Sequence, residues 1–168
     1  MSIAQSSRRH RPFNSPMECG LRMLFVLAAQ PGKPTDLQRL VSYDYLLVHS
    51  SDVAEGPTSL HPDVPFRGSE LLVKRDIVHA GLNQMFSREL LQKNFTMYGI
   101  TYCSNALTVP FIRLLVSDYA QALRKRSQWL VTQFGEMSDG DLADFMNANV
   151  GRWGAEFERF TATRDLEL

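Results

Sequence analysis

Helix-start signals followed by apolar residues at helical spacing constrain this chain more than any other feature. Ser15 can cap a helix, Pro16 suits the first helical position, and Glu18 stands three residues after the cap, where it completes a capping box. Apolar residues at helical spacing follow between positions 21 and 28, and a Pro-Gly pair at 31–32 stops the pattern. These signals predict a first helix that begins directly after Ser15.

Similar signals predict the remaining elements. Thr35 opens a second capping pattern with Gln38 in the box position, and a third helix is expected to begin at Gly68 or Ser69. Two short apolar runs at 90–95 and 100–103, separated by a turn at 96–99, are typical of a hairpin. A long helix at 105–134, interrupted near Pro110, and a last helix capped by Ser138 complete the chain.

This order of elements predicts a mainly α fold: a winged-helix-like domain of three helices plus a β-hairpin wing, with a C-terminal helical extension. We expect residues 1–14 to be a disordered basic arm and residues 15–168 to form a single domain. Within that domain, 15–104 would be the core and wing and 105–163 the C-terminal helices. A hydrophobic content of 44% and a charged content of 21% are ordinary for a globular protein and exclude wholesale disorder.

Charge and cysteine content narrow the class of protein further. The formal net charge is zero, which argues against binding nucleic acid or an anionic membrane by bulk charge alone. Arg8-Arg9 before an apolar stretch superficially resembles an export signal, but the apolar run is short and no cleavage site follows. Two cysteines are too few for a disulfide scaffold and favour a reducing compartment. We therefore expect a cytoplasmic protein that does not associate with membranes.

No motif predicts catalysis. Gly32-Lys33-Pro34-Thr35 resembles the end of a phosphate-binding loop, but Leu27 stands where that motif needs glycine. The pairs His49/Asp52 and His61/Asp63 lack the four ligands that structural zinc needs. No serine lies in a nucleophile-elbow motif, and no acid–base constellation is recognisable. The sequence therefore favours a protein that is not an enzyme and has no catalytic residue, metal or cofactor.

Winged helices often bind DNA, and the predicted third helix and wing are the elements that would make that contact. Residues 69–99 contain four bases and three acids, which offers few cations to phosphate. A loop of roughly 20 residues also separates the second and third helices, whereas a helix-turn-helix connection needs about three or four. The four bases form either a solvated face or a secondary contact to DNA held by a larger partner: Lys74, Arg75, Arg88 and Lys93.

Several segments of the chain resemble one family of proteins. They cover residues 14 to about 160, and the stretch from Asp36 to Val73 is the most specific part. The segments are Asn14-Ser15-Pro16, Asp36-Leu37-Gln38-Arg39-Leu40-Val41, Tyr43-Asp44-Tyr45-Leu46-Leu47-Val48-His49-Ser50, Gly56-Pro57, Ser59-Leu60-His61-Pro62, Arg67-Gly68, Glu70-Leu71-Leu72-Val73, Arg152-Trp153-Gly154 and Glu156-Phe157. In these segments the chain resembles the middle component of bacterial ABC-three-component systems, the small subunit also found in Lamassu-type anti-phage defence operons.

The resemblance implies a non-enzymatic accessory subunit. Members of that family accompany a Rad50/SMC-like ATPase that senses DNA and an effector such as a nuclease, so contact with DNA would be indirect, through the complex. The resemblance implies no catalytic residue in this chain. The alternative from a different class is a free-standing winged-helix regulator that binds DNA itself.

The segment 49–68, rich in Pro, Gly, His and Ser and without periodicity, is the predicted docking surface for the partner. Its apolar residues predict that it packs against the domain. In the alternative interpretation, Tyr43 and His49 complete the core while Asp52 and His61 hold the loop by internal hydrogen bonds. The residues expected to line the partner contact are Tyr43, Asp44, His49, Ser50, Asp52, His61 and Arg67.

Overall fold

The computed structural model describes residues 14–63 and 67–164, with side chains described for 14–63, 71 and 73–152. Apart from Asn14, the predicted basic arm lies outside the described residues, as do positions 64–66 of the predicted docking loop. The elements are α1 (Pro16–Ala29), β1 (Thr35–Asp36), α2 (Leu37–Val48), the short 3-10 helix η1 (Ser50–Asp52), α3 (Arg67–Ser87), β2 (Gln92–Thr96), β3 (Gly99–Cys103), α4 (Thr108–Arg113), α5 (Asp118–Phe134) and α6 (Asp139–Arg164).

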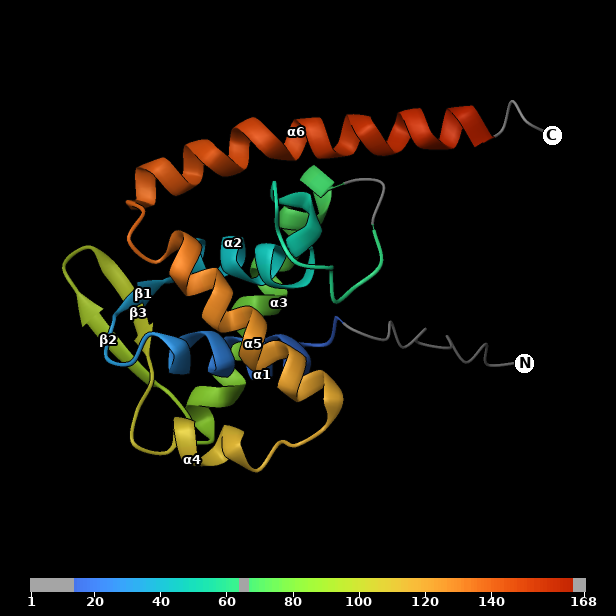
Figure 1. The fold of residues 1–168 in the computed structure, drawn as a ribbon. Helices are drawn as coiled ribbons and strands as arrows, with labels where there is room; N and C mark the ends of the chain where they lie inside the picture. The colour runs from blue at the N-terminus through green and yellow to red at the C-terminus, as the bar shows by residue number, and fades with distance from the viewer. Residues whose placement is uncertain (1–13, 64–66, 165–168) are drawn as a thin grey trace, which may run out of the picture.

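The arrangement is mainly helical, with one small antiparallel sheet, which confirms the predicted fold class. Helices α1, α2 and α3 pack together, and α5 packs on α1 and α2. Figure 1 shows the β2–β3 hairpin at one side of this helical body and α6 running across α2 and α3. The order helix–strand–helix–helix–strand–strand is compatible with a winged-helix-like arrangement followed by C-terminal helices.

The first helix begins where the capping box predicts. The Ser15 hydroxyl accepts a hydrogen bond from the Glu18 amide at 3.2 Å, and the Glu18 carboxylate accepts one from the Ser15 amide at 3.1 Å. Met23, Leu24 and Leu27 are fully buried, as are residues on other faces of α1. Because the partner helices cover α1 from several sides, it is the central helix of the core.

Two glycines let α1 and α3 approach closely. A Cβ atom added to Gly20 would lie 2.6 Å from the carbonyl oxygen of Gly81, closer than real Cβ atoms come to backbone. Gly81 is equally restricted from its own side, by the backbone of α1. Only hydrogen side chains at both positions allow this crossing.

The start of the second helix differs from the prediction by one residue. Asp36, not Thr35, is the N-cap: its carboxylate accepts a hydrogen bond from the Arg39 amide at 2.8 Å. Thr35 is part of the two-residue strand β1, which pairs antiparallel with Tyr102 and Thr101 of β3. The sheet order is therefore β1-β3-β2. The sequence pattern did not predict β1, because a strand of two residues is too short to show an alternation of apolar and polar side chains.

The other boundaries shift slightly, and one correction is larger. Helix α3 begins at Arg67, just before the predicted Gly68 or Ser69; β2 lies one or two residues later than expected, and β3 begins one residue earlier. The predicted interruption at Pro110 is wrong: Pro110 lies in the first turn of α4, where proline is tolerated. The helix instead breaks at 114–117, because the Ser117 side chain caps α5 by accepting from the Ala120 amide at 3.2 Å.

Helix α6 begins as predicted. The Ser138 hydroxyl accepts a hydrogen bond from the Asp141 amide at 3.1 Å. Within the ranges 14–63 and 67–164, no helix has the length and apolar character that crossing a bilayer requires.

Candidate partner-binding site

A buried ionic cluster lies where α1, α2 and α3 meet. The Asp44 carboxylate of α2 accepts hydrogen bonds from Arg22 Nε of α1 at 2.7 Å, from Arg22 Nη2 at 2.9 Å and from Lys74 Nζ of α3 at 3.0 Å. All three side chains are buried. Burial alone would raise the pKa of Asp44, but the two adjacent cations hold it well below its ordinary value. The cluster therefore keeps an ionised carboxylate inside the protein and ties three helices together.

The Cys19 thiol lies against this cluster. Arg22 Nη2 donates to Cys19 Sγ at 3.1 Å, so the guanidinium of Arg22 has partners on both α1 and α2. Burial raises the pKa of Cys19 to about 12, with the Asp44 charge acting in the same direction. The thiol is neutral at physiological pH and behaves as a packing residue.

His61 connects the predicted docking loop to the start of α5. Its Nε2 lies 2.8 Å from the Tyr119 hydroxyl, and the two rings stack with centroids 6.1 Å apart. Burial, together with the positive charges of Arg22 and Lys74, lowers the pKa of His61 to about 4. The imidazole is therefore neutral at pH 7 and sits beside a cluster whose net charge is positive.

The described part of the loop, 49–63, is tied by hydrogen bonds to α2 and within itself. The Leu60 and His61 amides both donate to the Val48 carbonyl, at 2.9 and 3.1 Å. Tyr45 donates its hydroxyl proton to Asp52 at 2.6 Å, and Ser50 donates to the Thr58 carbonyl at 3.3 Å. These bonds and the half-buried Val53 and Leu60 in the segment fix its shape.

The structure brings five of the seven predicted partner-contact residues together around this loop, whereas the Tyr43 hydroxyl lies at the corner between α5 and α6, beside Arg39 and the Phe134 carbonyl. Tyr43, Asp44, His49, Ser50 and His61 are buried, and Asp52 is half-buried. Arg67 begins α3, and its side chain lies outside the described residues. Direct partner contact by these residues stays a prediction, because the described ones lie mainly in the interior. Their observed contacts are those of the alternative interpretation, in which they complete the core and hold the loop.

The four predicted secondary DNA contacts lie in unlike environments. Lys74 is buried and ion-paired with Asp44, so its amine is not on the surface. Lys93 is half-buried and donates to the Asn83 side chain. Arg75 is exposed and donates to Gln38 at 2.8 Å, and Arg88 is exposed and donates to the Gln84 carbonyl at 2.9 Å. The structure does not form these four into one basic face.

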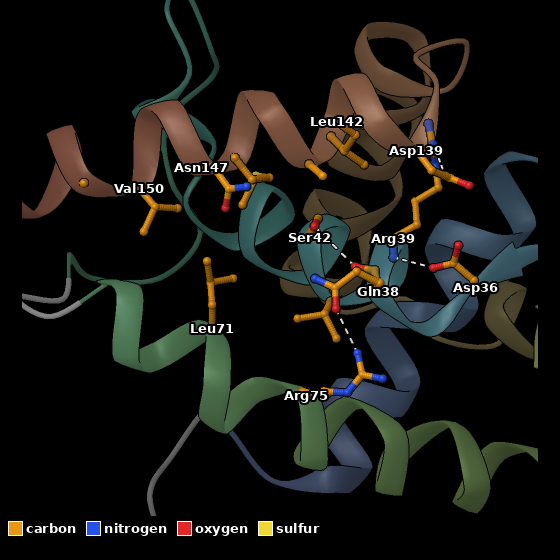
Figure 2. A pocket seen from close by; sticks show the side chains of 14 residues that line it. Asp36, Gln38, Arg39, Ser42, Leu71, Arg75, Asp139, Leu142, Asn147 and Val150 are labelled. Atoms are coloured by element: carbon orange, nitrogen blue, oxygen red, sulfur yellow. Dashed lines mark hydrogen bonds and ion pairs between the residues drawn. The ribbon is translucent and has the colours of Figure 1, made fainter.

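A groove that the sequence analysis did not identify lies between α2, α3 and α6. It has a volume of about 670 Å³. Figure 2 shows Leu71 of α3 and Val150 of α6 on opposite sides of it, with Leu142 farther along α6. Its lining carries two cations and two anions, since Arg39 and Arg75 accompany Asp36 and Asp139. The groove therefore favours neither a strongly acidic nor a strongly basic occupant.

Arg39 fixes one end of this groove. Its guanidinium donates to Asp139 at 2.5 Å, to the Phe134 carbonyl at 2.8 Å, to the Met137 carbonyl at 2.6 Å and to the Tyr43 hydroxyl at 2.8 Å. It thereby holds the corner between α5 and α6 against α2. Sequence reasoning missed this role because three of its four partners lie about 100 residues away and no local pattern marks them.

In the described part of the chain, no group of three or more His, Cys, Asp or Glu side chains is arranged to hold a metal ion. The arrangement that the structure does show is one of ionic and hydrogen-bonded ties between helices, with a shaped loop and a groove at the surface. Such features suit binding between macromolecules.

Comparison with known proteins identifies the family. Neither the curated proteins nor the solved structures contain a match to this chain. The family described as "ABC-three component (ABC-3C) system Middle Component 2" matches residues 12–156, which is most of the chain and includes α1 to α5 and the larger part of α6. The chain therefore belongs to the Middle Component 2 family of ABC-three-component systems.

Proposed function

We propose that this chain is a non-enzymatic accessory subunit that binds a Rad50/SMC-like ATPase and helps couple DNA sensing to a nuclease-type effector in bacterial anti-phage or anti-plasmid defence. The observation that carries the proposal is the family match over residues 12–156, since a middle component of a three-component system implies partner subunits. The Lamassu-type system is the member of this class that the sequence resembles.

The loop at 49–63 supports the proposal physically. A docking surface binds more tightly when it is held in its bound shape beforehand, because less conformational entropy is lost. Here Tyr45, Ser50 and His61 hold the loop from inside, while Ala54, Glu55 and Thr58 lie exposed on its outer side. We therefore place the ATPase contact on the outer side of the loop, with the buried residues of the predicted site as its support.

The test is reconstitution with the other two components of the three-component system. The wild-type chain should co-elute with the ATPase in size-exclusion chromatography with light scattering, and DNA should bind to the assembled complex. A tight, salt-dependent DNA shift by the chain alone near physiological salt would instead establish the free-standing winged-helix regulator. Absence of the chain from every complex of the other components would refute the accessory role.

The loop contact has its own test. Replacing Ala54 and Glu55 with arginine should weaken binding to the ATPase at least tenfold, because bulk and charge are added to an exposed docking surface. The matched control replaces Gln128 and Thr132, which are exposed on α5, with arginine. Unchanged affinity of the loop variant, with an unchanged melting temperature, would remove the loop from the interface.

A further inference from the structure

The tip of the β2–β3 hairpin exposes an unusual amount of apolar surface. Single exposed apolar residues are normal on a soluble protein, but a contiguous group marks an interaction site. Four apolar side chains lie within six consecutive residues, and their exposed fractions are 76% for Phe95, 89% for Met97, 92% for Tyr98 and 40% for Ile100. These four residues are called the hairpin tip below.

Strand register shows that part of the tip continues a face that is buried elsewhere. Lys93 pairs with Tyr102 and Phe95 with Ile100, so these four side chains share one face of the hairpin. At the base of that face Tyr102 is fully buried. The Lys93 amine lies 5.9 Å from the centre of the Tyr102 ring, and beyond it Phe95 and Ile100 have lost this cover. The core-facing side of the hairpin thus extends past the core that covers it.

The end of α3 adds another exposed apolar side chain near the hairpin. Phe86 is exposed, and the Lys93 amine lies 4.6 Å from the centre of its ring. The Lys93 amine therefore lies near two rings, that of Phe86 in α3 and that of Tyr102 in β3.

Charge restricts what can cover the tip. Residues 94–112, between Lys93 and Arg113, contain no charged side chain. Nucleic acids and anionic lipid surfaces are held chiefly through cations placed against phosphate groups. The tip offers none, so its uncharged apolar character is complementary to an uncharged apolar pocket on a protein.

The area that the tip can bury favours a different protein, rather than a second copy of this chain, as its partner. An aromatic side chain buries about 150–250 Å², so the two aromatic residues of the tip supply only about half of the roughly 800 Å² per partner that a stable interface needs. Tip-to-tip pairing of two copies would bury little else. Insertion into a larger pocket, with neighbouring surface added, meets the requirement.

The turn of the tip is also held in shape. Gly99 has a φ of +127°, a conformation that side-chain-bearing residues rarely adopt. The Thr96 hydroxyl donates to the Gly99 carbonyl at 3.0 Å and accepts from the Tyr98 amide at 3.2 Å. A shaped turn lowers the entropy lost on binding.

We propose that the hairpin tip inserts into an uncharged apolar pocket on another component of the same three-component system. The inference rests on the proposed function, which supplies the partner, and it adds a second contact at a surface remote in sequence from the docking loop. Tyr98 and Met97 are the anchors, since they are the most exposed of the four.

The experiment measures the affinity of the purified chain for the purified assembly of the other components by biolayer interferometry. The test variant is Met97→Ser with Tyr98→Ser, and Tyr98→Ala alone is the milder variant. The matched control is Leu114→Ser with Val116→Ser, which removes two apolar side chains of similar exposure from the α4–α5 connection. Circular-dichroism melts verify that every variant is folded.

Binding at least tenfold weaker for the tip variants, equal to about 1.4 kcal/mol, with the control unchanged, supports the proposal. Equal affinity of wild type and tip variants overturns it while leaving the proposed function intact. No binding by the wild-type chain refutes the proposed function itself.

Two further measurements on the chain alone identify the competing occupants. Sedimentation equilibrium that shows a dimer in the wild type and a monomer in the tip variant would assign the tip to self-association. Cosedimentation with phosphatidylcholine vesicles that the tip variant loses would assign it to a lipid surface. Either result overturns the proposal, and a monomeric, vesicle-free wild type supports it.

Discussion

Replacing Asp44 with asparagine tests whether the buried ionic cluster stabilises the fold. The substitution keeps the size of the side chain but removes the charge that Arg22 and Lys74 contact at 2.7–3.0 Å. Two buried cations are then left without their anion. Breaking a buried ion pair in this way costs about 3–5 kcal/mol, because the remaining charge is not resolvated.

That magnitude is large compared with the total stability of a domain, about 5–15 kcal/mol. For a chain of this size it corresponds to a fall of about 10 °C in melting temperature. The assay is urea unfolding at pH 7 followed by circular dichroism, with a thermal melt beside it. Glu136→Gln is the control: its exposed carboxylate lies 3.8 Å from Lys33, and such surface pairs contribute under about 1 kcal/mol.

A free energy of unfolding within about 1 kcal/mol of wild type for Asp44→Asn would refute the reasoning, since the two cations would then be accommodated without an anion. The pH dependence supplies a second check. Because the pKa of Asp44 is lowered in the folded state, its contribution is present above its unfolded value near 4 and is lost as the pH falls towards the folded value. Asp44→Asn should therefore flatten the acid limb of the stability profile.

The remaining predictions concern a helix crossing, a histidine and the corner at α6. Gly20→Ala should lower the free energy of unfolding in urea by about 1–3 kcal/mol, because the added Cβ would lie 2.6 Å from the Gly81 carbonyl oxygen. The control Gly151→Ala should be neutral or stabilising, because nothing lies within 4 Å of its Cβ position. Equal effects of the two substitutions would contradict the close approach of α1 and α3. In the folded protein the pKa of His61 is lowered from 6.5 to about 4, so the free energy of unfolding should fall as the pH drops from 6.5 to 4. His61→Gln should remove this pH dependence, and the control His79→Gln should leave it in place. Arg39→Met should speed hydrogen exchange in the first turns of α6, and unaltered protection there would show that other contacts hold the corner.

The seven residues predicted to contact a partner illustrate what a sequence pattern can locate. Asp52 and His61 lie in the loop and make hydrogen bonds to Tyr45 and Tyr119, while contact of the seven with a partner stays a prediction. Whether each side chain faces inward or outward depends on helices that pack from elsewhere in the chain. Lys74 shows the same limit: its charge looks like a surface feature in the sequence, yet Asp44 on another helix draws it into the core.

The sequence by itself determined the features that depend on neighbouring residues. The capping side chains Ser15 and Ser138 begin their helices where predicted, because an N-cap acts on amides two or three residues away. The family, too, is readable from the chain alone.

Only the tertiary structure decided the features that join distant segments. The pairing of Thr35 with Tyr102, the Asp44 cluster and the contact of Arg39 with Asp139 all connect residues that no local pattern relates. The exposure of the hairpin tip belongs with them: a run of apolar residues predicts burial, and only the extent of the surrounding core shows that Met97 and Tyr98 reach beyond it. The physical reason is that burial and ion pairing depend on which elements meet in space, whereas capping and helical periodicity depend on a few consecutive residues.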